Sequence, residues 1–185
     1  DSSIKSQKRL TAPRTIRNTY PIGKGEPIDH KTMVNIAWMM SENTDYETSL
    51  ILEIIAAILV GSAASPLRKA MIDSGLGEDL TPISGIEAEL KQLLFCAGLR
   101  NTQSSDIQNI EQLIFDTIKI IVANGFDNEL VEGVLHQIEF HGKEVVRGSY
   151  PYGISLMGNV FQTWLYDGDP LIGLDFPRAI EDIRR

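Results

Sequence analysis

The stretch from Tyr46 to Gly75 reads YETSLILEIIAAILVGSAASPLRKAMIDSG, and it decides the fold. Within positions 50–60 only Glu53 is not apolar, so a helix here must be covered by other elements on most of its sides. A connector of small residues follows. Ser65 and Pro66 are residue types favoured at a helix N-cap and at the first helical position. Gly75 suits a left-handed C-terminal cap. The stretch predicts a buried helix, a tight joint and a shorter helix.

Length and composition are those of one soluble globular domain. The chain has 185 residues, of which 43% are hydrophobic and 23% charged. A net charge of −8 argues against nucleic acid and anionic membranes as partners. The single cysteine, Cys96, excludes an internal disulfide framework and a multi-cysteine metal site. Neither a signal peptide nor an apolar run of roughly 20 residues is present, so we expect a cytoplasmic protein.

Hydrophobic periodicity predicts strands in the first half of the chain and helices in the second. We expect strands at 15–22 and 32–40, the latter a central strand, then the two helices, an irregular strand within 76–90 and a strand at 91–100. Helices are expected at 105–124, 127–147 and 154–166, with a last one from Pro177, and Asp127 can cap the second of them. Strands and helices that come in blocks predict an α+β fold, in the order β-β-α-α-β-β-α-α-α. We therefore expect an antiparallel sheet of about four strands with helices packed on one face.

The chain also divides at its N-terminal end. Residues 1–13 are polar and basic and end at Pro13, which favours a linker or arm. We expect residues 14–185 to form a single α+β domain. The chain opens without Met, and the helical pattern at its C-terminus stops abruptly. We therefore expect a fragment of a larger multidomain protein.

Residues 136–141 form the segment most similar to a catalytic motif. The sequence His-Gln-Ile-Glu-Phe-His is one residue longer than the inverted zinc motif H-x-x-E-H. On a helix a step of five residues turns the side chain by roughly 140°. His136 and Glu139 can therefore share an exposed face with Glu132, whereas His141 falls with Val134 on the inward stripe. A structural role is favoured over a zinc site.

The remaining chemical candidates also favour structural interpretations. His30 suits a solvated loop, and Gly23-Lys24-Gly25 lacks the spacing of a phosphate-binding loop and predicts a turn. Cys96 falls within a predicted strand, where a buried small residue is favoured over a nucleophile. Arg68-Lys69 can form a solvated helix face or contact a ligand.

Both tryptophans, Trp38 and Trp164, fall on predicted core faces, the latter with Met157 and Phe161 on its helix. Taken together, the residues predict no catalytic residue and no metal ligand, and they leave substrate-binding residues unassigned.

Several separated segments nevertheless resemble one family. The run GSAASPLRKAMIDSGLG at 61–77 resembles the pitrilysin/insulinase clan of zinc metallopeptidases, and its Ser-Pro-Leu form is similar to the presequence-protease and falcilysin subgroup. The runs HQIEFHGKE at 136–144, YPYGI at 150–154 and DPL at 169–171 agree in order. The resemblance covers about residues 14–185.

The resemblance implies a particular place in a larger enzyme. Members of the clan contain four homologous α+β domains in two halves of a clamshell, with the zinc motif in the first domain. This chain resembles the second, non-catalytic domain and has no H-x-x-E-H. The resemblance therefore implies a chamber wall that packs on the catalytic domain, zinc only in the parent's first domain, and short unstructured peptides as substrates. Partners would be the remaining domains and those peptides, and the negative charge would favour basic peptides.

Two other interpretations stay open. The first is a non-enzymatic assembly subunit with the same fold, as in the core subunits of respiratory complexes. The second is a metalloenzyme that uses His136, Glu139 and His141. An H-x-x-E-H sequence upstream in the full gene would distinguish the peptidase from the assembly subunit, and a zinc titration would test the metalloenzyme.

Overall fold

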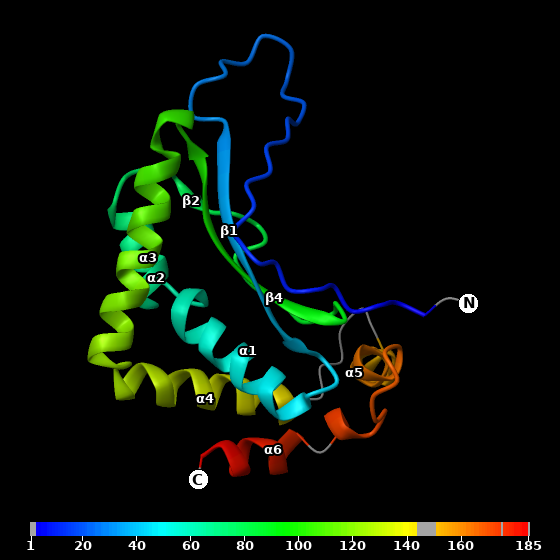
Figure 1. Cartoon of the computed structure of the whole chain (residues 1–185). Helices are drawn as coiled ribbons and strands as arrows, with labels where there is room; N and C mark the ends of the chain where they lie inside the picture. Colours follow the sequence, from blue (N-terminus) through cyan, green and yellow to red (C-terminus); the bar gives the residue numbers. More distant parts are fainter. Residues whose placement is uncertain (1–2, 144–150, 175, 185) are drawn as a thin grey trace.

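A computed structural model describes residues 3–143, 151–174 and 176–184 (Figure 1). The elements, in chain order, are β1 (Thr32–Glu42), α1 (Tyr46–Val60), α2 (Pro66–Asp73), β2 (Asp79–Leu80), β3 (Gly85–Glu87), β4 (Gln92–Thr102), α3 (Ile107–Asn124), α4 (Asn128–Lys143), α5 (Tyr152–Trp164) and α6 (Phe176–Ile183). Short 3-10 helices cover Ser104–Asp106 and Ile172–Leu174. This mixture of helices and antiparallel sheet is the predicted α+β class.

The sheet is open and antiparallel, and β4 is its central strand. β1 pairs along one side of β4, while the short strands β2 and β3 pair with the other side. In the register, Trp38 lies opposite Phe95 and Ile36 opposite Ala97. Phe95, Ala97 and Leu99 alternate along β4 and are buried, as their spacing predicts.

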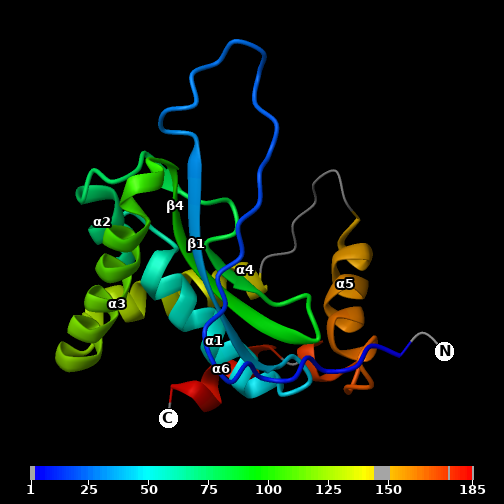
Figure 2. The same ribbon diagram turned by 45° about the horizontal axis from the view of Figure 1, so that its top comes forward.

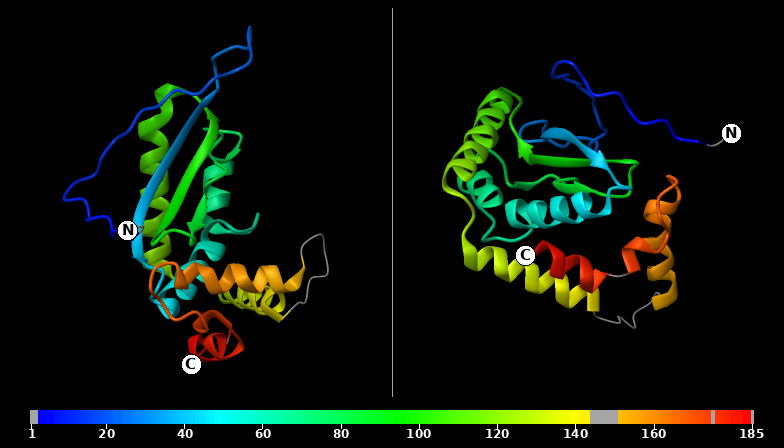
Figure 3. Two further views of the ribbon diagram at one scale, coloured as in Figure 1. Left: turned by 90° about the vertical axis from the view of Figure 1, so that its right-hand side faces the viewer. Right: turned by 60° about the horizontal axis from the view of Figure 1, so that its bottom comes forward.

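Helix α1 lies between two hydrophobic clusters, as its apolar sequence predicts. Ala56 and Val60 belong to the cluster formed with the sheet, α2 and α3. Leu50, Ile54 and Ile58 belong to the second cluster, formed with α4 and α6. Figure 3 shows α1 between the sheet on one side and α4 with α6 on the other. The molecule is therefore layered as sheet, inner helices and outer helices.

The joint between α1 and α2 differs in one detail from the prediction. Ser65 precedes Pro66 at the start of α2, but its hydroxyl does not cap that helix. The Oγ atom instead donates to the carbonyl of Ala57 at 3.2 Å and accepts the Ser62 amide at 3.0 Å. Ser65 is fully buried, so it ties the end of α1 to the joint. Gly75, with φ of 68°, has the left-handed conformation expected of it.

The strand predicted at 15–22 is wrong. Residues 15–22 have no strand conformation, and Ile16 and Tyr20 are exposed. The strand at 32–40 is confirmed as β1, but its central position is wrong, because within the described residues β1 pairs with β4 alone. The expected number of strands is still reached, because the 76–90 segment supplies two strands instead of one.

The helices of the second half are confirmed, but the predicted inward face of α5 is wrong. Asp127 accepts the backbone amide of Leu130 at 2.9 Å, which confirms it as the cap of α4. Met157, Phe161 and Trp164 do not point into the core, because all three are exposed on α5 and Trp164 stacks on Phe161. The predicted extension of α4 to residue 147 lies outside the described residues.

Candidate functional site

The His136–His141 segment forms part of the outer face of α4. His136 is exposed, as predicted for this face. Glu139 is 3.5 Å from Arg184 after α6, and Glu132 is 3.3 Å from the same guanidinium. This face of α4 therefore holds the C-terminal helix by ion pairs.

His141 does not lie on the inward stripe, and that prediction is wrong. Its ring is exposed, and Nδ1 lies 2.8 Å from the carbonyl oxygen of Gln137 on the same helix. Val134 and Leu135 are buried against α1 and α6, but beyond Ile138 the helix borders an open cleft. The imidazole of His141 therefore lines this cleft, at a position where the hydrophobic periodicity predicts a buried side chain.

His30 and the glycine-rich loop have the local structures expected of them. His30 is exposed in the turn before β1, with a positive φ of 56°, and its Nε2 lies 3.1 Å from Gln103 Nε2. Lys24 and Gly25 form a turn in which Gly25 has φ of 86°, a conformation that suits glycine.

Cys96 is buried in β4, opposite Ala37 of β1 and Gly85 of β3. Burial raises the pKa of its thiol, and the negative charge of Glu87 adds to the effect. A thiolate is therefore disfavoured at this position.

The basic pair on α2 does not form a uniform solvated face. Arg68 is half-buried and lies 3.2 Å from Asp79, whose other oxygen lies 3.2 Å from Arg100. The backbone amide of Leu80, donating at 2.8 Å, and the Arg100 side chain hold the pKa of Asp79 below its ordinary value. Lys69 is exposed and paired with Asp73 one turn away. Arg68 thus has a structural partner that links α2 to β2 and β4.

Within the part of the chain that the structure describes, no group of three or more His, Cys, Asp or Glu side chains is arranged to hold a metal ion. None of the described helices combines the length and apolarity needed to cross a membrane.

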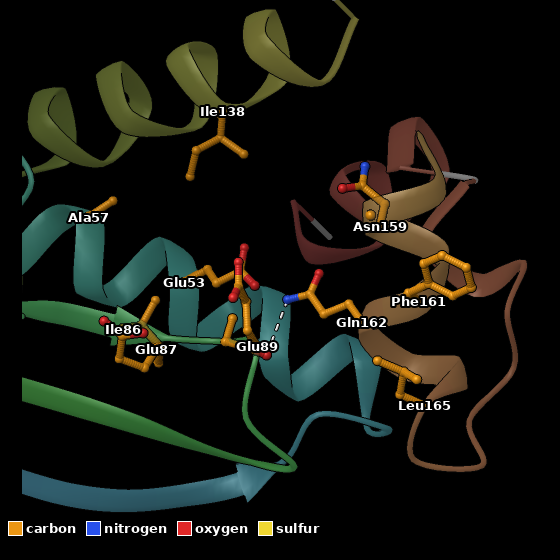
Figure 4. Close-up of a pocket in the computed structure, with 12 residues that line it drawn as sticks. Glu53, Ala57, Ile86, Glu87, Glu89, Ile138, Asn159, Phe161, Gln162 and Leu165 are labelled. Carbon is orange, nitrogen blue, oxygen red and sulfur yellow. Dashed lines mark hydrogen bonds between the residues drawn. The ribbon is translucent and has the colours of Figure 1, made fainter. Parts of the chain in front are cut away.

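A cleft lies between α1 and β3 on one side and α5 on the other (Figure 4). It has two lobes of about 810 and 590 Å³. Both lobes share the residues Glu53, Ala88, Ile138, Asn159 and Gln162.

Polar contacts hold α5 across this cleft. Asn43 donates to the carbonyl of Gln162 at 2.7 Å, and the Gln162 amide donates to Ala88 at 3.2 Å. Tyr166 donates to the carbonyl of Glu89 at 3.1 Å. The cleft is therefore bridged at one end by hydrogen bonds and not closed by apolar packing.

Glu53 is the notable residue of the cleft, and the sequence pointed to it without giving it a role. It is the one acidic residue in the apolar run of α1. Burial raises the pKa of its carboxyl above the ordinary value. The sequence could not place it in a cleft, because α5 follows it by about a hundred positions and meets it only in the folded chain.

Known proteins resemble the whole chain in sequence. It is 38% identical over 184 residues to presequence protease 1, chloroplastic/mitochondrial, of Arabidopsis thaliana, covering 99% of this chain and 17% of that protein. It is 34% identical to protein HypA of Clostridium perfringens, covering 100% of this chain and 19% of the relative. The mouse mitochondrial presequence protease is 29% identical over 92% of the chain and 16% of its own length. The chain thus spans less than a fifth of these relatives.

Solved structures support the fold. One, described as the inactive peptidase domain of a proposed zinc protease from Bordetella parapertussis, superposes with a TM-score of 0.64 at 14% identity, over 81% of this chain and 76% of that one. A family model, the peptidase M16 inactive domain, matches residues 2–138. The chain therefore belongs to the family of inactive domains of M16 peptidases.

Proposed function

We propose that this chain is the second domain of a zinc-dependent peptidase, in which it packs on the catalytic domain and forms part of the wall of a closed chamber. In this proposal residues 14–185 are one domain and residues 1–13 an arm. The zinc and the residues that cleave the peptide belong to a preceding domain, and this chain contributes neither catalytic residues nor metal ligands.

The match to an inactive peptidase domain is the observation that carries this proposal. Two features of the structure support it. On α4, Glu132 and Glu139 form ion pairs with Arg184, whereas His136 and His141 are exposed to solvent. The outer surface of α5 also exposes large apolar side chains, among them Met157 and Trp164. Apolar surface of this kind suits contact with a further domain, and the relatives have ample chain to supply one.

We further propose that the substrates are short unstructured peptides, and that basic peptides are favoured. The relatives named presequence protease support a peptide substrate. The net charge of −8 supports a preference for basic ones through long-range steering. The compartment stays a prediction: the sequence favours the cytoplasm, whereas several relatives are named as mitochondrial or chloroplastic.

The decisive experiment is an assay of unstructured peptides with the full-length protein and with this chain alone. We expect the full-length protein to cleave them, to lose activity on chelation and to recover it with zinc. We expect this chain to be inactive and to bind no stoichiometric zinc. Cleavage or tight zinc binding by the chain alone would contradict the proposal.

The same experiment tests the assembly subunit. An intact polypeptide that lacks H-x-x-E-H and cleaves no peptide would favour that role instead. A comparison of basic and acidic peptides over a salt series tests the steering: equal rates without salt dependence would remove it.

A further inference from the structure

The two-lobed cleft beside α5 combines apolar walls with negative charge. Ile86, Phe161 and Leu165 contribute apolar surface to the larger lobe. Glu53, Glu87 and Glu89 contribute carboxylates to the same lobe, and Figure 4 shows Glu53 and Glu89 directed toward the same central space. None of the described residues that line this lobe is Lys, Arg or His. The larger lobe thus has an excess of negative charge that its described lining does not neutralise, whereas His141 lines the smaller lobe.

Among these carboxylates, Glu53 is the one whose negative charge is disfavoured by burial. It extends from the middle of α1, and its carboxylate has no hydrogen-bond or ion-pair partner among the described residues. Burial alone raises its pKa. A partly desolvated carboxylate without a cation is unfavourable unless a ligand or a proton neutralises it. A positively charged group in the cleft would remove this penalty.

The smaller lobe has an independent unsatisfied group. Asn43 lines this lobe and is 2% exposed. Its Nδ2 donates to Gln162, whereas its Oδ1 is buried without a hydrogen-bond donor among the described residues. An amide oxygen that is buried without a donor is unfavourable, so the hydrogen bonding at this end of the cleft is incomplete among the described residues.

We propose that this cleft binds the side chain of an arginine or lysine from a peptide, with its cationic end near Glu53 and Glu89 and its aliphatic stem against the apolar side chains that line the larger lobe. An arginine fits best, because its several N–H donors in one planar group can contact more than one carboxylate. A metal ion fits less well, because these carboxylates do not converge as a ligand group within the described chain. The proposal deepens the proposed function by giving the chamber wall a binding site for basic peptides, and it rests on that function.

Binding can be measured without cleavage. The probe is a dye-labelled pentapeptide with arginine at its centre, compared with the same peptide carrying glutamine, by fluorescence anisotropy on the full-length protein in EDTA. A zinc peptidase is inactive under these conditions. Failure of the binding site is therefore distinguishable from failure of the proposed peptidase function.

We expect the arginine peptide to bind about tenfold or more tightly than the glutamine peptide, and Glu53→Gln to abolish most of this difference because it removes the desolvated charge. Glu89→Gln should weaken binding by a smaller factor. Glu47→Gln, at an exposed position of the same helix, is the matched control and should leave binding unchanged.

Three results would overturn the proposal. The two peptides could bind equally, Glu53→Gln could leave the preference intact, or the full-length protein could fail to bind the arginine peptide. The last result would mean that the cleft is filled by another part of the polypeptide. Circular dichroism of each variant excludes loss of folding as the cause.

Discussion

Helices α3 and α5 have comparable amphipathic sequences, but the apolar side chains of α3 are buried and those of α5 are exposed. On α3, Ile110 and Ile114 are completely buried against the sheet and α2. On α5, Met157 is 53% and Trp164 56% exposed, and the helix is held mainly by hydrogen bonds from Asn43 and Gln162. Figure 2 shows the two helices at opposite ends of the molecule. An amphipathic pattern thus predicts that a face will be covered, but not that this chain covers it.

The largest expected difference is in the free energy of unfolding, between a buried position on α3 and an exposed position on α5. Ile114→Ala should lower the free energy of unfolding by about 2–5 kcal/mol, because it removes a fully buried side chain and leaves a cavity. Met157→Ala, on the exposed face of α5, should change it by about 0.5 kcal/mol or less. Chemical denaturation of both variants provides the measurement. Equal losses would show that α5 is packed in solution as α3 is.

A second pair of variants compares the backbone of the sheet with that of α5. A Cβ atom at Gly98 would lie 2.0 Å from the carbonyl oxygen of Val34, so Gly98→Ala forces the two strands apart. We expect a loss of about 1–3 kcal/mol.

Gly158→Ala in α5 is the matched control, since nothing lies within 4 Å of its Cβ position. Alanine in a helix interior should stabilise by about 0.5–1 kcal/mol relative to glycine. Thermal unfolding of both variants checks the opposite signs. A Gly98→Ala variant as stable as the parent would contradict the close strand contact.

The first residues of α3 and of α4 should differ less in their contribution to stability. Asp127 caps α4 through the Leu130 amide, whereas Asp106 before α3 makes no side-chain cap. Asp127→Ala should therefore cost about 1 kcal/mol, and Asp106→Ala markedly less. Urea denaturation measures both. If Asp106→Ala proves the more damaging change, the caps are assigned to the wrong helix.

The smallest effect concerns pH and Glu53, which lines the cleft between α1 and α5. Because burial raises the pKa of Glu53 in the folded state, the folded protein keeps this proton to higher pH than the unfolded chain. Stability therefore falls as the pH rises from about the ordinary pKa through the raised one. Glu53→Gln should remove this fall, so the variant should be more stable than the parent protein at neutral pH.

Unfolding curves over a pH series test this expectation. Glu47→Gln, exposed on the same helix, should keep the pH dependence of the parent. A Glu53→Gln variant whose stability follows the same pH curve as the parent would mean that Glu53 is solvated or already paired in solution.

The elements that the sequence predicts well are those fixed by local chemistry. The apolar run of α1, the glycine at position 75 and the Asp127 cap each act within a few residues. The strand at 15–22 failed because its alternating pattern is only half of the requirement. A strand also needs a partner edge, and within the described chain residues 15–22 have none. The prediction that Met157, Phe161 and Trp164 of α5 point into the core failed for the same reason. Within the described chain, no other element covers these side chains.

By itself the sequence determined the α+β class, the buried central helix and the family resemblance, because periodicity, capping residues and motif order are local properties of the chain. Only the tertiary structure decided that β4 and not β1 is central, that Ser65 ties α1 to its joint, and that Glu53 faces α5 across a cleft. These features depend on segments far apart in sequence. Their pairing is set by which surfaces bury the most apolar area together, and no local pattern encodes that choice.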